Sequence, residues 1–321
     1  MPDIWEHNGR YNLLRLCVDT CTRASYRRLR WNGTLPSEGA VIIAPNHTNT
    51  LMDALVVLQT RKEPTVFGAR ADIFRNPKAA AALRFLRILP MTRERDGLHS
   101  VVDNYKTFDE IDSVLEHGVP FCMFPEGRHR AERGLLPILK GIARIAFRSA
   151  AERQTYVVPT GITYGDFFRY RSTCDGIFGE PIDVNAFLRE REELPEAEKY
   201  AQFRELLSEH ILELVDMNPQ AKRLSFWWIL LFPLWVLAAL LSLPIWLPAE
   251  WLCHNKLGDK AFSNSVRLLF RLVLTPVLLL VWALVLCLTM PWWLSLPLLI
   301  LFLFSYSLFY DGLNWLHDRR A

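Results

Sequence analysis

The sequence predicts an α/β domain with a mostly parallel sheet flanked by helices, followed by a helical membrane region. Two observations lead to this prediction. Up to about residue 215, short β-prone runs alternate with helical segments, an order typical of parallel sheets with helical crossovers. Beyond residue 225, long segments carry no charge, and only ten acidic and basic residues remain. A uniformly soluble globular protein is therefore excluded.

Length, charge and cysteine content narrow the class of protein. The chain has 321 residues, of which 51% are hydrophobic and 22% charged, and its formal net charge is +3. This composition is too apolar for a disordered protein. The small net charge argues against a nucleic-acid partner bound through bulk charge. The six cysteines form no CxxC pair, and we expect them to be reduced thiols of a cytosol-facing protein without a cleavable signal.

The first element, in residues 1–30, is an amphipathic helix. Leu14, Cys17, Val18 and Cys21 recur at helical spacing, and six arginines between residues 10 and 30 add positive charge. Such a helix either docks on anionic lipid at the membrane interface or packs on its own domain. Because the chain also carries an apolar anchor, we favour docking.

The catalytic domain is expected over residues 31–218. Strands are predicted at 40–44, 65–69, 119–124 and 155–160, and helices at 51–60, 77–86, 104–116 and 138–151. A charged helix over 194–215 leads to the last part of the chain. In a sheet of this kind, functional residues gather at the carboxyl ends of the strands.

The anchor is expected over residues 219–321, with hydrophobic segments at 226–248, 272–289 and 292–310. The uncharged run 272–310 would be about 60 Å long as one helix, roughly twice the hydrocarbon thickness, so we predict two spans. The break is placed near Met290 and Pro291, where Trp292 and Trp293 suit the membrane interface. With no ionisable residue inside either run, a passive anchor is favoured over a pore.

Basic residues predict the orientation of this region. They lie before and after the hairpin but not at its turn, which places both ends, and the catalytic domain, on the cytoplasmic face of an integral membrane protein. The first run, 226–248, has basic residues on both flanks. It is either a plain span or a re-entrant hairpin favoured by its prolines, and the sequence leaves both open.

The segment NHTNTLMD places two groups for acid–base chemistry at the end of the strand predicted at 40–44. A carboxylate from Asp53 would hold His47 in one tautomer, so that the imidazole could take a proton from a hydroxyl at neutral pH. The alternative is structural: Asp53 would cap a helix and His47 would be an ordinary loop residue.

The segment FPEGRHR follows the strand predicted at 119–124. It delivers Glu126, the flexible Gly127 and two arginines, Arg128 and Arg130, to one strand end, a set suited to an anionic substrate that carries hydroxyls. A solvated basic loop is the alternative. Arg93 adds a further cation after PMT. There is no GxGxxG, Walker, HExxH or GxSxG motif, which leaves dinucleotide, nucleotide, zinc-protease and α/β-hydrolase functions without support.

Taken in order, NHTNTLMD, PMTR, FPEGRHR and VVPTG resemble the four blocks of the glycerolipid acyltransferase superfamily, the PlsC-like enzymes that esterify glycerol phosphates and lysophospholipids. The resemblance covers roughly residues 30–185, including FGEPIDV, which is similar to the closing strand and turn of the family. Four ordered blocks are far more specific than any one of them.

The resemblance implies a role for each matched residue. His47 would be the general base and Asp53 its orienting partner, with direct attack on an acyl thioester. Arg93 would bind the acceptor phosphate, Glu126 and Gly127 would position the glycerol backbone, and Pro159 would shape the acyl-pocket wall. The family uses acyl-CoA or acyl carrier protein as co-substrate and needs no cofactor and no metal.

This chain departs from the family pattern at two places. Five residues separate His47 from Asp53, where most members have four; the fungal-type glycerol-3-phosphate and dihydroxyacetone-phosphate acyltransferases also have five. The usual EGTRS is EGRHR here, so His129 occupies the place of an arginine, and Arg128 or Arg130 would bind phosphate instead; the sequence does not choose between these two.

We therefore expect a membrane-bound O-acyltransferase of phospholipid synthesis that acts on glycerol 3-phosphate or dihydroxyacetone phosphate on the way to phosphatidic acid. Its expected partners are the lipid bilayer, acyl-CoA or acyl carrier protein and the glycerol phosphate acceptor. The alternative within the class is acylation of 1-acylglycerol 3-phosphate (lysophosphatidate) or another lysolipid. A remote alternative is a non-catalytic membrane scaffold.

Overall fold

The computed structural model describes residues 3–6, 8–92, 99–215 and 231–318, with the side chains of 99–105 left aside. Its centre is one sheet with the strand order β1 (Arg28–Asn32), β7 (Thr173–Phe178), β6 (Thr155–Tyr164), β2 (Ala40–Pro45), β5 (Phe121–Cys122), β3 (Val66–Arg70) and β4 (Ile88–Met91). A short β8 (Ile182–Asp183) also pairs with β6. Neighbours are parallel except where β6 meets β7 and β8. The predicted fold class is confirmed.

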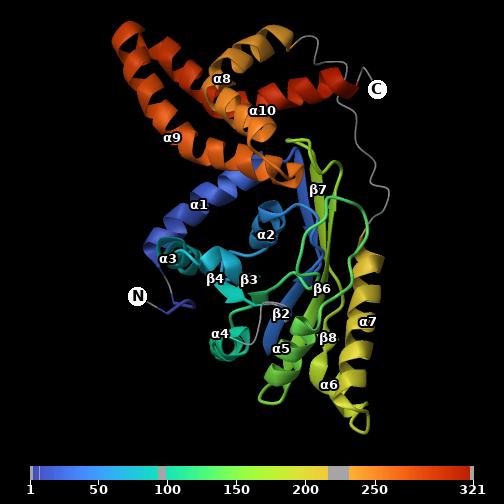
Figure 1. The fold of residues 1–321 in the computed structure, drawn as a ribbon. Helices are drawn as coiled ribbons and strands as arrows, with labels where there is room; N and C mark the ends of the chain where they lie inside the picture. The colour runs from blue at the N-terminus through green and yellow to red at the C-terminus, as the bar shows by residue number, and fades with distance from the viewer. Residues whose placement is uncertain (1–2, 7, 93–98, 216–230, 319–321) are drawn as a thin grey trace.

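Helices cover both faces of this sheet (Figure 1). They are α2 (Leu51–Leu58), α3 (Pro77–Phe85), α4 (His99–Glu116), α5 (Lys140–Ala150), α6 (Val184–Arg189) and α7 (Glu196–Leu214), with a 3₁₀ turn η1 at Ala71–Phe74. Alternate residues of β2 enter two separate cores: Ile42 packs with residues of α4, α5 and α7, and Ile43 packs with α2. A strand buried on both faces needs a continuous apolar run, which is why AVIIA is readable in the sequence.

The first helix, α1 (Gly9–Ala24), packs against α2 and α9. Its Arg15 is buried, and the guanidinium donates to the backbone oxygens of Leu58 and Arg61 at the end of α2. On the outer face, Leu13 and Leu16 are 67% and 64% exposed. The helix therefore packs on its own domain and also presents apolar side chains outward, while its docking on lipid stays a prediction.

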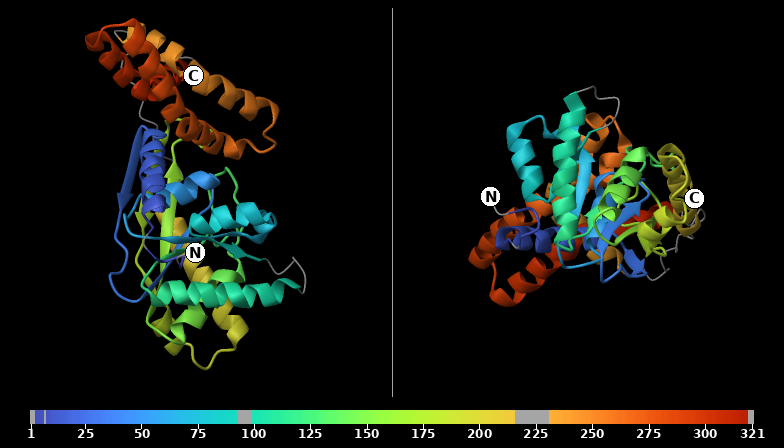
Figure 2. Two further views of the ribbon diagram at one scale, coloured as in Figure 1. Left: turned by 90° about the vertical axis from the view of Figure 1, so that its left-hand side faces the viewer. Right: turned by 90° about the horizontal axis from the view of Figure 1, so that it is seen from below.

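Three helices are long and apolar enough to cross a membrane: α8 (Phe232–Asn255), Lys260–Thr289, which joins the turn η4 (Lys260–Phe262) to α9 (Ser263–Thr289), and α10 (Trp292–Asp318). They lie together beyond one end of the sheet (Figure 2). The chain reverses at Met290 and Pro291, where the sequence predicts the break. Leu280 and Leu288 of α9 are 73% and 78% exposed, as expected for a lipid-facing surface.

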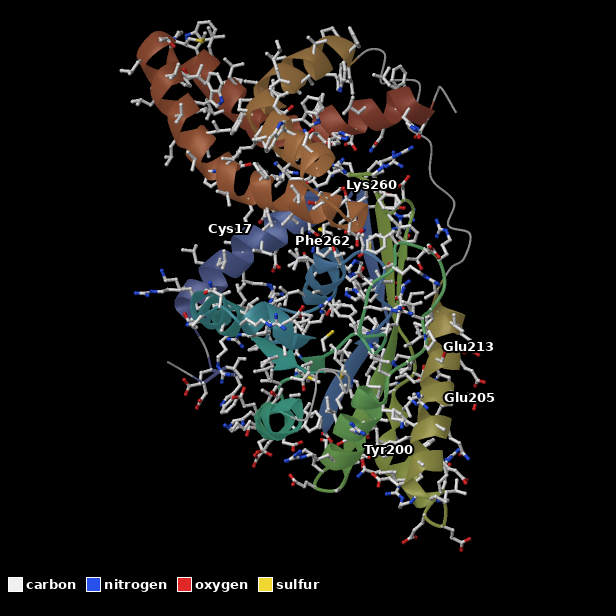
Figure 3. The ribbon with its side chains drawn as sticks, in the orientation of Figure 1. Cys17, Tyr200, Glu205, Glu213, Lys260 and Phe262 are labelled. Atoms are coloured by element: carbon white, nitrogen blue, oxygen red, sulfur yellow. The ribbon has the colours of Figure 1, made fainter. Side chains whose placement is uncertain are left out.

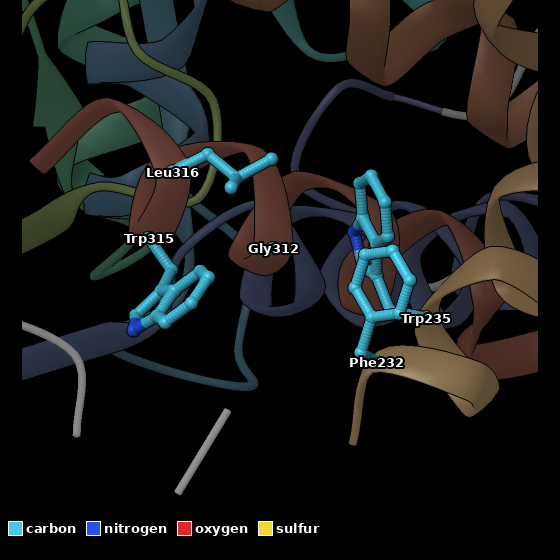
Figure 4. A pocket seen from close by; sticks show the side chains of 5 residues that line it. All are labelled: Phe232, Trp235, Gly312, Trp315 and Leu316. Carbon is cyan, nitrogen blue, oxygen red and sulfur yellow. The ribbon is translucent and has the colours of Figure 1, made fainter. Parts of the chain in front are cut away.

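Over its described part, the first apolar run forms one continuous helix, α8, instead of a two-helix hairpin. Pro244 and Pro248 lie inside it, and the ribbon is bent (Figure 1), because an internal proline removes a backbone hydrogen bond and favours a kink. The helix packs closely on α10 where Trp235 covers Gly312 beside a small apolar pocket (Figure 4). A β-carbon at Gly312 would lie only 1.9 Å from Trp235 Nε1, so this contact requires glycine.

Polar contacts join the helical region to the sheet domain. Arg171, in the turn between β6 and β7, forms a two-pronged ion pair with Asp311 of α10, at 3.0 and 2.6 Å. Arg271 of α9 donates to the backbone oxygen of Ala24 at 3.1 Å. The loops that follow β2, β5 and β6 all contact residues 259–267. The carboxyl ends of these strands, where an α/β sheet places its site, therefore face the apolar helices.

Candidate active site

Two loops meet at the carboxyl ends of β2 and β5. The strands are parallel neighbours, with Ile43 opposite Cys122, and the Met123 amide donates to Ile43 O at 3.1 Å. The loop after β2 carries His47, and the loop after β5 carries Glu126. Strand pairing therefore brings together two segments that lie about eighty residues apart in the sequence.

Asp53 is fully buried in the first turn of α2 and accepts four hydrogen bonds. Its Oδ2 receives His47 Nδ1 at 2.8 Å and the amides of Thr48 and Asn49 at 2.8 and 2.7 Å. Its Oδ1 receives the hydroxyl of Tyr164 at 2.7 Å. Burial, with the nearby Asp53 charge, holds the pKa of Tyr164 well above its usual value, so the phenol remains a donor.

These contacts determine the proton arrangement of His47. A carboxylate only accepts hydrogen bonds, so in the neutral imidazole the proton is on Nδ1 and the lone pair is on Nε2. Among the described residues, Nε2 has no hydrogen-bond partner, and the side chain is 17% exposed. Phe124 stacks on the imidazole with ring centroids 4.1 Å apart and fixes the ring plane. The structure thus presents a single oriented, accessible base.

Glu126 is 4% exposed and holds the two loops together. Its Oε1 accepts the backbone amide of His47 at 2.6 Å, and its Oε2 accepts the amide of Leu136 at 2.8 Å. Burial raises the pKa of this carboxyl, and the two amide donors act in the opposite direction. Glu126 therefore positions the backbone of His47, while its contact with a glycerol moiety stays a prediction.

Gly127 makes the turn that allows this geometry. Its φ is +63°, and a β-carbon there would lie 2.5 Å from Leu139 Cδ1, so glycine fits where other residues would be strained and crowded. Beyond it, the Arg130 amide donates to His47 O at 3.1 Å. The Arg130 side chain lies 3.3 Å from Glu132, whereas the exposed Arg128 has no ion pair within the described part of the chain.

The remaining predicted site residues lie apart from this cluster or outside the description. Pro159 is buried in β6 opposite Ala44 of β2, and its role in an acyl pocket stays a prediction. Arg93 lies outside the described residues. No group of three or more histidine, cysteine, aspartate or glutamate side chains that could hold a metal ion occurs in the described ranges.

Three residues of the site were not predicted to have a role: Asn46, Tyr164 and Asp259. Asn46 is buried, and its side chain exchanges two hydrogen bonds with the backbone of Ile162, at 3.0 and 2.7 Å, which fixes the start of the His47 loop on β6. Tyr164 at the end of β6 and Asp259 beyond α8 also reach the site. Asn46 directly precedes the histidine at a strand end, and this was the available signal.

The chain was also compared with known proteins. Residues 28–163 match the family model described as Acyltransferase. The matched segment carries His47, Asp53, Glu126 and Pro159 and covers less than half of the chain. It supports the glycerolipid acyltransferase superfamily that the motifs resemble, while the particular similarity to fungal-type enzymes stays a prediction.

Among solved structures, the chain is similar to the 1-acyl-sn-glycerophosphate (LPA) acyltransferase PlsC from Thermotoga maritima. The TM-score is 0.45 and the identity 18%, over 63% of this chain and 78% of that chain. No curated protein matches the sequence.

Proposed function

We propose that this protein is a membrane-bound O-acyltransferase that moves a fatty acyl group from a thioester of coenzyme A or acyl carrier protein to a hydroxyl of glycerol 3-phosphate or dihydroxyacetone phosphate. The observation that carries the proposal is the His47–Asp53 pair. Asp53 holds the imidazole by Nδ1 and leaves Nε2 open at the carboxyl end of β2. The match to the acyltransferase model supports the reaction class.

The reaction follows from the proton arrangement of His47. Nε2 takes the proton of the acceptor hydroxyl while the hydroxyl oxygen attacks the thioester carbonyl and forms a new C–O bond. The tetrahedral intermediate then collapses, the C–S bond breaks, and the proton on Nε2 passes to the leaving thiolate. Asp53 stabilises the imidazolium that exists between these steps. Proton transfer by a positioned general base such as His47 contributes about 10²- to 10⁴-fold in rate.

An anionic acceptor would be bound by the cations next to the base. Arg128 and Arg130 directly flank His129 in the sequence, and the His129 ring centroid is 5.6 Å from that of His47. Arg130 already lies beside Glu132, so of these two arginines we assign the larger share of phosphate binding to Arg128. Arg128→Ala should then raise the KM for the phosphate acceptor more than Arg130→Ala does; the reverse order would reassign the role.

A second acceptor class is favoured by the position of the site. The ring of Phe262, at the base of the apolar helices, lies 5.2 Å from that of His129, so an acceptor that already carries an acyl chain could reach the base from the membrane side. Lysophosphatidate is therefore the alternative acceptor. Side-by-side rates with acylated and unacylated acceptors separate the two.

The test is an acceptor panel on the full chain in detergent or lipid nanodiscs. We expect thioester consumption with glycerol 3-phosphate or dihydroxyacetone phosphate, its loss in His47→Ala, and its retention in His210→Ala, a histidine of α7 outside the site. Failure to consume acyl-CoA or acyl carrier protein thioester with any of these acceptors or lysophosphatidate would falsify the acyltransferase proposal and favour a non-catalytic scaffold.

A further inference from the structure

Residues 259–265 lie between the end of α8 and the first turn of α9 and include the turn η4; this connecting segment contacts both loops of the candidate active site. Figure 3 shows Lys260 and Phe262 of this connecting segment at the base of α9, above the carboxyl end of the sheet. One set of contacts reaches the loop that carries His47, and another reaches the loop after β5. A passive anchor would need neither.

The first set of contacts goes through Thr50. This residue lies between His47 and Asp53 and has φ +50°, a conformation that a β-branched residue keeps only where its surroundings fix it. Thr50 is also the N-cap of α2, where a threonine hydroxyl normally bonds to the amides of its own helix. It makes no such bond here.

The hydroxyl of Thr50 instead points to the membrane helices. Thr50 Oγ1 lies 3.1 Å from Ser265 Oγ and 3.4 Å from the backbone oxygen of Ala261. Both Thr50 and Ser265 are buried, at 4% and 3% exposed. The Thr50 hydroxyl, which would otherwise cap α2, therefore bonds to the connecting segment instead.

The second set of contacts goes through His129 in the loop after β5. His129 Nε2 lies 2.8 Å from Asp259 Oδ2, and this hydrogen bond lowers the pKa of Asp259. Phe262 also packs against this imidazole in an edge-to-face arrangement, with ring centroids 5.2 Å apart. His129 in turn stands edge-on to His47. The loop that carries His47 and the loop after β5 are thus both held by residues 259–265.

The hydrophobic core shows the same connection. Leu268, one turn after Ser265, is 1% exposed and belongs to the core cluster that includes Met52 and Val56 of α2. The helix that carries Asp53 is therefore packed on α9 as well as hydrogen-bonded to it.

We propose that the connecting segment 259–265 is a positioning element of the active site, which holds His47 and Asp53 in register through Thr50 and Ser265. The inference deepens the proposed acyltransferase function and rests on it. The membrane helices then form part of the catalytic unit. Loss of the Thr50 hydroxyl leaves the strained loop unfixed and lowers kcat, since the base moves relative to the bound substrates, while thioester binding is kept.

The test compares matched variants of the full chain in nanodiscs. Thr50→Val removes the hydroxyl and keeps the shape of the side chain, whereas Thr50→Ser keeps the hydroxyl. Ser265→Ala removes its partner. Ser242→Ala is the control, because Ser242 is buried and its hydroxyl bonds to the backbone oxygen of Ala239 in the same helix. We expect kcat to fall on the order of ten- to a hundredfold in Thr50→Val and Ser265→Ala, with the KM for thioester little changed. The kcat of Thr50→Ser should lie much closer to wild type than that of Thr50→Val, and the kcat of Ser242→Ala should match wild type. Wild-type kcat in both Thr50→Val and Ser265→Ala overturns the proposal.

A second measurement is independent of turnover. The rate at which diethyl pyrocarbonate modifies His47, followed by peptide mass spectrometry, should change in Thr50→Val and Ser265→Ala, while the rate at His210 stays constant. An inactive wild type with this His47 response would reject the acyltransferase and retain the positioning role. An unchanged His47 rate in both variants rejects the positioning role whatever the activity. Should Thr50→Val fail to fold, Ser265→Ala decides.

Discussion

Glu126→Gln is the substitution that most sharply separates positioning from substrate binding. The side chain is 4% exposed, and its two oxygens accept the amides of His47 and Leu136 at 2.6 and 2.8 Å. Glutamine has the same shape but only one oxygen acceptor, so its NH₂ group must face one of the two amides. One buried N–H donor is then left without an acceptor.

The expected loss follows from these contacts. A hydrogen bond to a charged group contributes about 1.5–3 kcal/mol, and an unsatisfied buried donor costs about 1–3 kcal/mol more. Removing a desolvated charge offsets part of this, since burial raises the pKa of the carboxyl. We expect a net destabilisation of about 2–3 kcal/mol, which corresponds to a fall in Tm of roughly 4–12 °C for a domain of this size. The His47 backbone also shifts, so kcat should fall by about 10- to 100-fold.

Thermal unfolding and steady-state kinetics of the same preparation decide the matter. Glu132→Gln is the matched control. The Glu132 side chain is 67% exposed and pairs with the exposed Arg130, so the Tm and kcat of this variant should stay close to wild type. A Glu126→Gln variant with wild-type Tm and kcat but a raised acceptor KM would refute this reasoning. That result would instead support a direct contact between Glu126 and the glycerol backbone, as the family resemblance implies.

Three further substitutions test other parts of the structure. Tyr164→Phe removes the donor to Asp53 Oδ1 and should lower kcat about tenfold at unchanged KM; an unchanged kcat would deny Tyr164 a role in orienting the pair. Asp311→Ala leaves Arg171 as an unpaired, largely buried charge and should destabilise the protein by about 3–5 kcal/mol in thermal unfolding; a wild-type Tm would contradict this. Leu284→Lys, on the exposed face of α9, should disfavour insertion by about 2.5–3.5 kcal/mol, measured as the carbonate-resistant membrane fraction; an unchanged fraction would place this face against protein.

The strands that the sequence predicts and those it misses differ in where they lie in the sheet. The predicted runs 40–44, 65–69, 119–124 and 155–160 correspond to β2, β3, β5 and β6, all interior strands. β1 and β4 were missed and form the two edges. An edge strand tolerates charge, as in RLRWN, and proline, as in ILPM, so it lacks the continuous apolar run that marks an interior strand. The missed β7 lies between β1 and β6.

The site was predictable as far as its contacts are local. His47 and Asp53 are six residues apart, and a strand end followed by a helix start brings them together. Tyr164 lies 111 residues from Asp53, and Asp259 lies 130 residues from His129, so only the fold shows these pairs. Glu126 illustrates a different limit. The sequence of a strand end does not show whether its carboxylate will face substrate or two backbone amides. The difference depends on burial, which is determined only by the packing of the whole fold.

The division of the chain near residue 219 is a division of composition more than of structure. The core between the sheet and α4, α5 and α7 lies within the sheet domain. The core on the other face of the sheet also includes Leu268 of α9. Removing the helices would uncover that core next to α2, and it would also break the contacts of Thr50 and His129. In a sheet whose carboxyl ends carry the chemistry, some element must cover those ends. Here the base of the apolar helices does so, and this places the proposed reaction where a water-soluble phosphate and an acyl chain can meet.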